Sequence, residues 1–195
     1  MTVQPIVLMG NPLLMRRAEP VPDVGAPEVS QLIADMKDSM AAAGGIGIAA
    51  PQIGVSLRVV MFHAPGNDDS GGDSTDEDHR SDIKERPLTI LINPEIEILT
   101  SETRSGWEGC LSVPGLRGVV PRYTRLVYRG LTLEGEWIER LATGFHAVVV
   151  QHECDHLDGI LYPMRRIDLS TLQFVSEMEK LAASAGAPLP KEMME

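Results

Sequence analysis

The sequence predicts an α+β fold in which a central apolar helix packs among antiparallel β-sheets, with further helices near the N- and C-termini. The segment 144–157 is apolar almost all round, which is typical of a helix buried at the centre of a domain. Short apolar runs of strand length lie before it, separated by turn-forming residues. With 195 residues, 43% of them hydrophobic, the chain can bury one core, and we expect a single domain over residues 1–195.

Hydrophobic spacing and turn residues locate the expected elements. An N-terminal helix, Pro27–Ala43, has apolar residues on one face and ends at paired glycines, which commonly terminate helices. A last helix is expected from about Ser170 to Ala185, after the central helix Gly144–Leu157. The expected strands, the last two of which form a hairpin, are Leu57–His63, Leu88–Asn93, Glu95–Leu99, Arg125–Tyr128 and Glu136–Leu141.

Two segments are expected to lie outside the packed domain. Residues 64–87 are acidic, rich in Gly and Ser and without periodicity, so they cannot bury enough apolar surface to offset the entropy of ordering. We expect a flexible surface insertion, with His79 in solvent. The alternative is a role in gating a cleft or in holding divalent ions. The tail, 186–195, is expected to be frayed.

The charge balance and hydropathy exclude several classes of protein. Acidic residues outnumber basic ones by 28 to 17, giving a net charge of −11, which argues against nucleic acid as a primary ligand. No apolar run approaches the roughly 20 residues of a membrane span. Met1–Leu14 lacks the basic start and apolar stretch of a secretory signal. We therefore expect a cytoplasmic protein without membrane association.

The segment His152-Glu153-Cys154-Asp155-His156 is a complete HExxH metal-site pattern inside the expected central helix. Residues four apart on a helix lie about 40° apart around its axis, so the two imidazoles can bind one ion. The adjacent glutamate then lies where it can act on a water molecule. The alternative is a pair of core histidines, which is unfavourable because burying two histidines beside two carboxylates is costly without a partner.

A catalytic metal usually needs a third protein ligand and an open position. Tyr162 stands where the extended protease pattern HExxHxxGxxH requires a histidine. Glu177 and Glu179 follow HExxH at a sequence distance that would suit a third ligand. The pattern around them, however, indicates a helix exposed to solvent. Cys110, in a turn-rich segment, is the better candidate because a thiolate is a good ligand for zinc or ferrous iron. A structural buried cysteine is the alternative.

A third segment, GIGIAAPQ (Gly45–Gln52), follows the N-terminal helix, and its glycines allow the backbone to approach a ligand closely. The segments GIGIAAPQ, EGCLS and HECDH, in this order, resemble the three motifs of the peptide deformylases. These enzymes remove the N-formyl group from the N-terminal methionine of nascent polypeptides. The resemblance extends from about Pro5 to about Asp168.

The resemblance implies that Cys110, His152 and His156 bind one divalent metal ion and that Glu153 is the general base. A bound metal lowers the pKa of water far enough to supply a nucleophile near neutral pH. The native ion would be Fe²⁺, with Zn²⁺, Ni²⁺ or Co²⁺ as substitutes in the isolated protein. The ligands alone do not decide between these metals.

The resemblance also assigns residues to the substrate, an N-formylmethionyl nascent peptide. The Gln52 side chain and the backbone N–H of Leu111 would stabilise the oxyanion, and Gly47 would contact the substrate through its backbone. The substrate-binding residues would be Ile46, Gly47, Trp107, Arg117, Phe145, Val148 and Val149. Core packing is the alternative role for Phe145 and Val149.

Some family members carry a basic C-terminal helix that docks on the ribosome. The corresponding part of this chain is more acidic than basic, which argues against that mode of docking and leaves open a transient contact. The residues concerned are Glu177, Glu179, Glu192 and Glu195 against Lys180 and Lys191.

Two other functional classes share part of the pattern. A zinc endopeptidase would contain HExxH but would leave Cys110 and Gln52 unexplained. A non-enzymatic, metal-dependent module that associates with the ribosome would be expected to have lost Glu153. The deformylase interpretation accounts for all three motifs.

Overall fold

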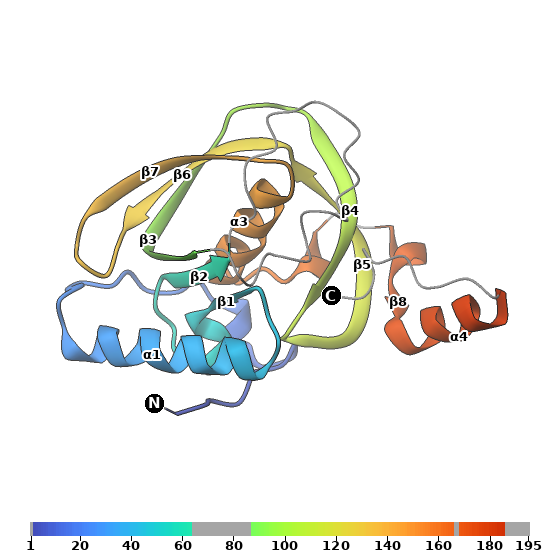
Figure 1. Ribbon diagram of the computed structural model, residues 1–195, viewed down its shortest axis with the longest axis horizontal. Coiled ribbons are helices and arrows are strands. Elements are labelled where there is room, and N and C mark those ends of the chain that lie inside the picture. Colours follow the sequence, from blue (N-terminus) through green and yellow to red (C-terminus); the bar gives the residue numbers. More distant parts are fainter. Residues whose placement is uncertain (1, 64–86, 166–167, 186–195) are drawn as a thin grey trace.

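The computed structural model describes residues 2–63, 87–165 and 168–185, and it confirms the α+β class (Figure 1). The expected insertion, up to residue 86, and the expected tail lie outside the described residues. The helices and strands are α1 (Pro27–Ala42), β1 (Gly47–Ala49), β2 (Val59–His63), β3 (Leu88–Ile98), β4 (Thr103–Cys110), β5 (Val113–Tyr123), β6 (Arg125–Leu131), β7 (Trp137–Thr143), α3 (Gly144–Leu157), β8 (Gln173–Phe174) and α4 (Val175–Ala185).

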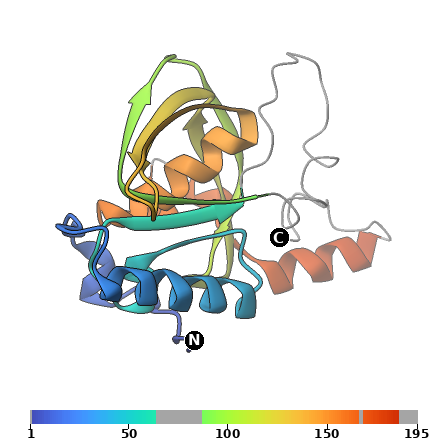
Figure 2. The same ribbon diagram turned by 60° about the vertical axis from the view of Figure 1, so that its left-hand side comes forward.

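The described strands form two antiparallel sheets, ordered β1-β2-β3-β6-β7 and β4-β5-β8. Strands β1 and β2, and residues 90–92 of β3, are apolar at successive positions because both of their faces are covered. Met61 and Ile92 belong to the core cluster that packs on α1, whereas Val60 and Leu91 belong to the cluster that packs on α3. Figure 2 shows this layering, with the sheet between α1 and α3.

Helix α3 lies inside the fold, as its all-round apolar sequence predicts. Ala147, Val150 and Leu157 are completely buried, and the helix contacts β1, β2, β5, β6 and β7. The helix begins at Gly144, whose φ of +56° suits a residue without a side chain at the turn from β7. Because α3 also carries the HExxH pattern, the core fixes the position of the candidate metal ligands.

The structure corrects three expectations about the helices and strands. The two segments predicted as separate strands around Pro94 are one strand, β3, bent at a β-bulge between Ile92 and Glu95. At the bulge Asn93 has a φ of +53°, and its amide bonds to the backbone N–H and C=O of Val21 at 2.8 and 2.9 Å. The bulge accommodates a proline because it interrupts the ladder of hydrogen bonds.

The second and third corrections concern the region around Cys110 and the C-terminus. The turn-rich segment around Cys110 predicts a loop, but Cys110 ends β4, which pairs with β5 over most of its length. The last helix begins at Val175 rather than near Ser170, because Gln173 and Phe174 form the short strand β8 beside β5. Only Met178 of α4 is buried. In the part of the chain that the structure describes, no helix is long and apolar enough to span a membrane.

Candidate active site

The β4–β5 hairpin and α3 bring one cysteine beside two histidines. One ligand atom each of Cys110, His152 and His156 lie within 4.8 Å of one another. Sγ of Cys110 is 3.4 Å from Nε2 of His156. Glu177 and Glu179, the alternative ligands, lie exposed on α4 and outside this cluster. The structure therefore brings together the three residues that the motifs single out.

The cluster fits a divalent metal ion by its chemistry and its surroundings. One thiolate and two imidazoles are ligands that suit zinc and ferrous iron and leave a coordination position open. Oε2 of Glu153 and Nδ1 of His156 are buried without a hydrogen-bond partner among the described residues. Buried polar atoms are normally hydrogen-bonded. Two such atoms without a protein partner, next to a thiolate and two imidazoles, indicate that the site also binds groups that are not part of the protein.

A buried network of ion pairs joins the hairpin to the helix behind the cluster. Arg122 on β5 donates from Nε and Nη2 to the two carboxylate oxygens of Glu108, at 2.7 and 2.9 Å. Its Nη1 donates to Asp155 at 2.6 Å. All three side chains are less than 10% exposed. Glu108 lies two residues before Cys110, and Asp155 lies between the two histidines, so Arg122 links both ligand-bearing elements.

Glu108 also determines which nitrogen of His152 faces the cluster. Its Oε2 lies 2.7 Å from Nδ1 of His152. Burial alone would raise the pKa of Glu108, but Arg122 and His152 lower it to about 2, so it remains a carboxylate near neutral pH. A carboxylate accepts a hydrogen bond from Nδ1–H, which leaves Nε2 free to bind a metal. The ring of Tyr162 stacks on that of His152, with 6.5 Å between centroids.

Sequence reasoning did not identify this supporting network. Glu108 stands within the EGCLS motif, so its position next to Cys110 was a usable signal. Asp155 likewise stands within the HECDH motif. Arg122 gave no signal that distinguished it, because its partners lie far along the chain: 14 residues separate it from Glu108 and 33 from Asp155.

The first motif places an amide beside the cysteine. Gln52, in the 3₁₀ helix Ala50–Ile53, is 2% exposed. Its Oε1 accepts from the Ala49 N–H at 2.8 Å, which fixes the orientation of the amide. Nε2 consequently lies 3.5 Å from Cys110 Sγ and 3.2 Å from Ser112 Oγ. A neutral N–H donor is therefore held at the edge of the candidate metal centre.

Gly47 and Glu153 lie in close contact. A Cβ built on Gly47 would come within 2.7 Å of the Glu153 carboxyl carbon and closer still to Oε1. Any side chain at position 47 would therefore displace the carboxylate. Burial raises the pKa of Glu153 to about 7, so its carboxyl group can both accept and donate a proton near neutral pH.

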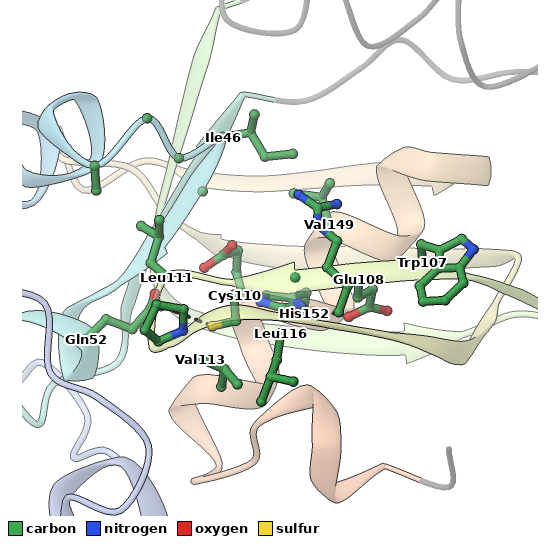
Figure 3. A pocket seen from close by; sticks show the side chains of 18 of the residues that line it. Ile46, Gln52, Trp107, Glu108, Cys110, Leu111, Val113, Leu116, Val149 and His152 are labelled. Carbon is green, nitrogen blue, oxygen red and sulfur yellow. Dashed lines mark hydrogen bonds and ion pairs between the residues drawn. The ribbon is translucent and has the colours of Figure 1, made fainter. Parts of the chain in front are cut away.

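The cluster opens into a cleft of about 640 Å³, drawn in Figure 3. In that view Gln52 and Leu111 lie at one end and Trp107 at the other, with His152 between them. The residues expected to bind substrate all line this cleft: Ile46, Gly47, Trp107, Arg117, Phe145, Val148 and Val149. Their contact with a substrate stays a prediction.

An α+β fold with a Cys-His-His cluster, a buried glutamate and a partly apolar cleft is typical of a metal-dependent hydrolase. The chain belongs to the polypeptide deformylase family, whose model matches residues 3–171. It is thus a peptide deformylase, an enzyme of the class that removes the N-formyl group from nascent polypeptides. The deformylase prediction is confirmed, and the endopeptidase and binding-module alternatives are wrong.

Individual peptide deformylases are similar to this chain in sequence and structure over most of its length. Peptide deformylase 2 of Ralstonia nicotianae is 54% identical over 172 residues, which cover 88% of this chain and 92% of the relative. Peptide deformylase 1 of Nitrosomonas europaea is 51% identical, with 86% and 89% covered. A Met-Ala-Ser-bound crystal structure of class I type b peptide deformylase from Acinetobacter baumannii has a TM-score of 0.71 at 36% identity, covering 85% of this chain and 100% of that one.

The substitution Glu108→Gln tests the supporting network. The amide cannot replace the charged acceptor of His152 and Arg122, so affinity for Zn²⁺ or Co²⁺, measured by competition with a chelator, should fall about 10- to 100-fold. Glu97→Gln is the control: it breaks the exposed pair with Arg129, and metal affinity should not change. Equal affinities in Glu108→Gln and wild type would show that the network does not orient the ligand.

Gly47→Ala tests the close contact with Glu153. The added methyl group displaces the carboxylate, and a misplacement of about 1 Å should lower kcat/KM roughly 10²-fold while metal content stays the same. Gly106→Ala, on β4, is the control because a Cβ there meets nothing within 4 Å. Wild-type activity in Gly47→Ala would mean that the carboxylate position is unimportant.

Proposed function

We propose that Cys110, His152 and His156 hold one divalent metal ion and that Glu153 transfers the proton as the formyl group is removed from N-formylmethionyl peptides. The observation that carries this proposal is the convergence of the three ligand atoms within 4.8 Å, in a cleft that Glu153 and Gln52 also line. When bound, the metal supplies a nucleophile by lowering the pKa of water towards neutrality.

Glu153 is suited to move the proton. It is 5% exposed, and its raised pKa of about 7 matches that of an efficient general acid–base group near neutral pH. It accepts a proton from the attacking water and donates it to the departing amine nitrogen. The absence of a side chain at Gly47 leaves the carboxylate free to face the cleft.

Gln52 and Leu111 are suited to stabilise the negative charge on the formyl oxygen. The Gln52 amide is fixed through its Oε1, so Nε2 needs no reorientation as charge develops. Leu111 follows Cys110 at the end of β4 and lines the same cleft, where its backbone N–H would be the second donor. Fixed donors of this kind contribute about 3–4 kcal/mol each to transition-state stabilisation.

The methionine side chain would occupy the apolar part of the cleft, between Ile46 and the α3 residues Phe145, Val148 and Val149. An unbranched thioether fits an apolar pocket without strict demands on shape. Arg117 would bind the peptide backbone farther along the cleft. The peptide deformylase of Acinetobacter baumannii has a structure with Met-Ala-Ser bound, which supports the binding of a peptide by this chain.

We further propose Fe²⁺ as the native ion, replaced by Zn²⁺, Ni²⁺ or Co²⁺ during isolation in air. Family membership supports this choice, since a thiolate and two imidazoles are compatible with all four ions. The proposed location is the cytoplasm, where nascent chains are made. Any contact with the ribosome would be transient, since the exposed α4 carries Glu177 and Glu179 against Lys180.

Glu153→Gln separates catalysis from metal binding. Because Glu153 is not a proposed ligand, metal content should stay near that of the wild type. Formate release from formyl-Met-Ala-Ser should fall by roughly 10²- to 10⁴-fold, the usual loss for a general base. Glu134→Gln, in the exposed β6–β7 turn, is the control. Parallel loss of metal and activity would assign Glu153 a structural role instead.

Cys110→Ser tests the thiolate ligand. A hydroxyl is a poor ligand for a soft metal, so the variant should lose its metal during dialysis against a chelator that leaves the wild type loaded. Cys154→Ala is the matched control because Cys154 is buried in the core cluster around α3, and its loss should not alter metal content. Retention of metal by Cys110→Ser would remove Cys110 from the ligand set.

A further inference from the structure

The C-terminal segment forms part of the wall of the substrate cleft. Val175, the first residue of α4, lines the same cavity as Cys110 and Glu153. The preceding strand, β8, pairs with β5 through Leu116 opposite Phe174 and Arg117 opposite Gln173. A segment far downstream of the metal motifs therefore extends the sheet that carries Cys110.

This part of the wall is held in place by several independent contacts. The Val119 N–H donates to Thr171 Oγ1 at 3.1 Å, and Met178 of α4 is 5% exposed. Leu116 and Leu172 pack against the buried cluster that contains Tyr162. The rest of α4 extends away from the sheets (Figures 1 and 2). The start of the helix is thus fixed beside the cleft, although most of the helix is not.

The cleft is larger than the methionine side chain requires. A cavity of about 640 Å³ is in the range that encloses a drug-sized ligand rather than a single side chain. In Figure 3 Leu116 lies on the opposite side of His152 from Ile46 and Val149, which are proposed to hold the methionine. Each further residue of an extended peptide advances about 3.3 Å, so the residues after methionine remain within reach of the cleft wall.

We propose that Leu116 and Val175 form an apolar rim that contacts the second and third residues of the substrate and makes this enzyme favour nascent chains with apolar side chains there. The proposal rests on the placement of the metal and the methionine given above. Leu116 and Val175 are each partly exposed, so an apolar side chain of the substrate gains burial against them, whereas a polar one loses hydration without a partner.

The test compares kcat/KM for formyl-Met-Leu-Leu-amide with kcat/KM for formyl-Met-Ser-Ser-amide. The ratio cancels any general loss of activity that affects both peptides equally. The wild type should favour the leucine peptide by about fivefold or more, the size expected for partial burial of apolar side chains. Val175→Thr, which keeps the side-chain shape, should reduce the ratio at least twofold, and Val175→Asp should bring it to one or below.

Leu181→Thr is the matched control, because Leu181 lies on the same helix, is 66% exposed and does not line the cleft; its ratio should equal that of the wild type. If both Val175 variants kept the wild-type ratio, even with kcat/KM lowered equally for both peptides, the proposed rim would be wrong and Val175 would have only a structural role. Failure of the wild type to release formate from either peptide would instead overturn the proposed site.

Discussion

The site depends on the buried ion pairs that Arg122 makes with Glu108 and Asp155. The candidate ligands come from two elements, a strand end and a helix, and neither element alone would fix their separation. Removing one partner of a buried pair costs about 3–5 kcal/mol because a charge is left uncompensated. Such a network therefore resists relative displacement of the two elements, and it continues through Glu108 to the ring of His152.

The same helix serves as the core of the fold and as the support of the site. One side of α3 packs on the apolar strands, while His152 and Glu153 line the cleft and His156 lies beside the cysteine. This arrangement buries ionisable groups that would be unfavourable in an ordinary core. The ion pairs compensate the buried charges of Glu108, Arg122 and Asp155. Glu153 has no such partner among the described residues, and its raised pKa follows from that environment.

Local sequence was sufficient for some elements and insufficient for others. Helix α3 and the β6–β7 hairpin have clear patterns, and the HExxH spacing alone places two histidines together. Strands β4 and β5 were not recognised because glycines and prolines, such as Gly109 and Pro114, interrupt their alternation. Their pairing depends on partners across the hairpin rather than on local preference. The bidentate contact of Arg122 with Glu108 and the β5–β8 pairing are likewise long-range, and no local pattern encodes them.

X-ray absorption spectroscopy of the zinc-loaded protein tests the central claim most directly, because it reports the atoms bound to the metal without requiring activity. If the hairpin and the helix present Cys110, His152 and His156 to one ion, the spectrum should show one sulfur at about 2.3 Å and two imidazole nitrogens at about 2.0–2.1 Å. A first shell of nitrogen and oxygen only would contradict the account, since it would mean that the network does not bring the cysteine to the histidine pair.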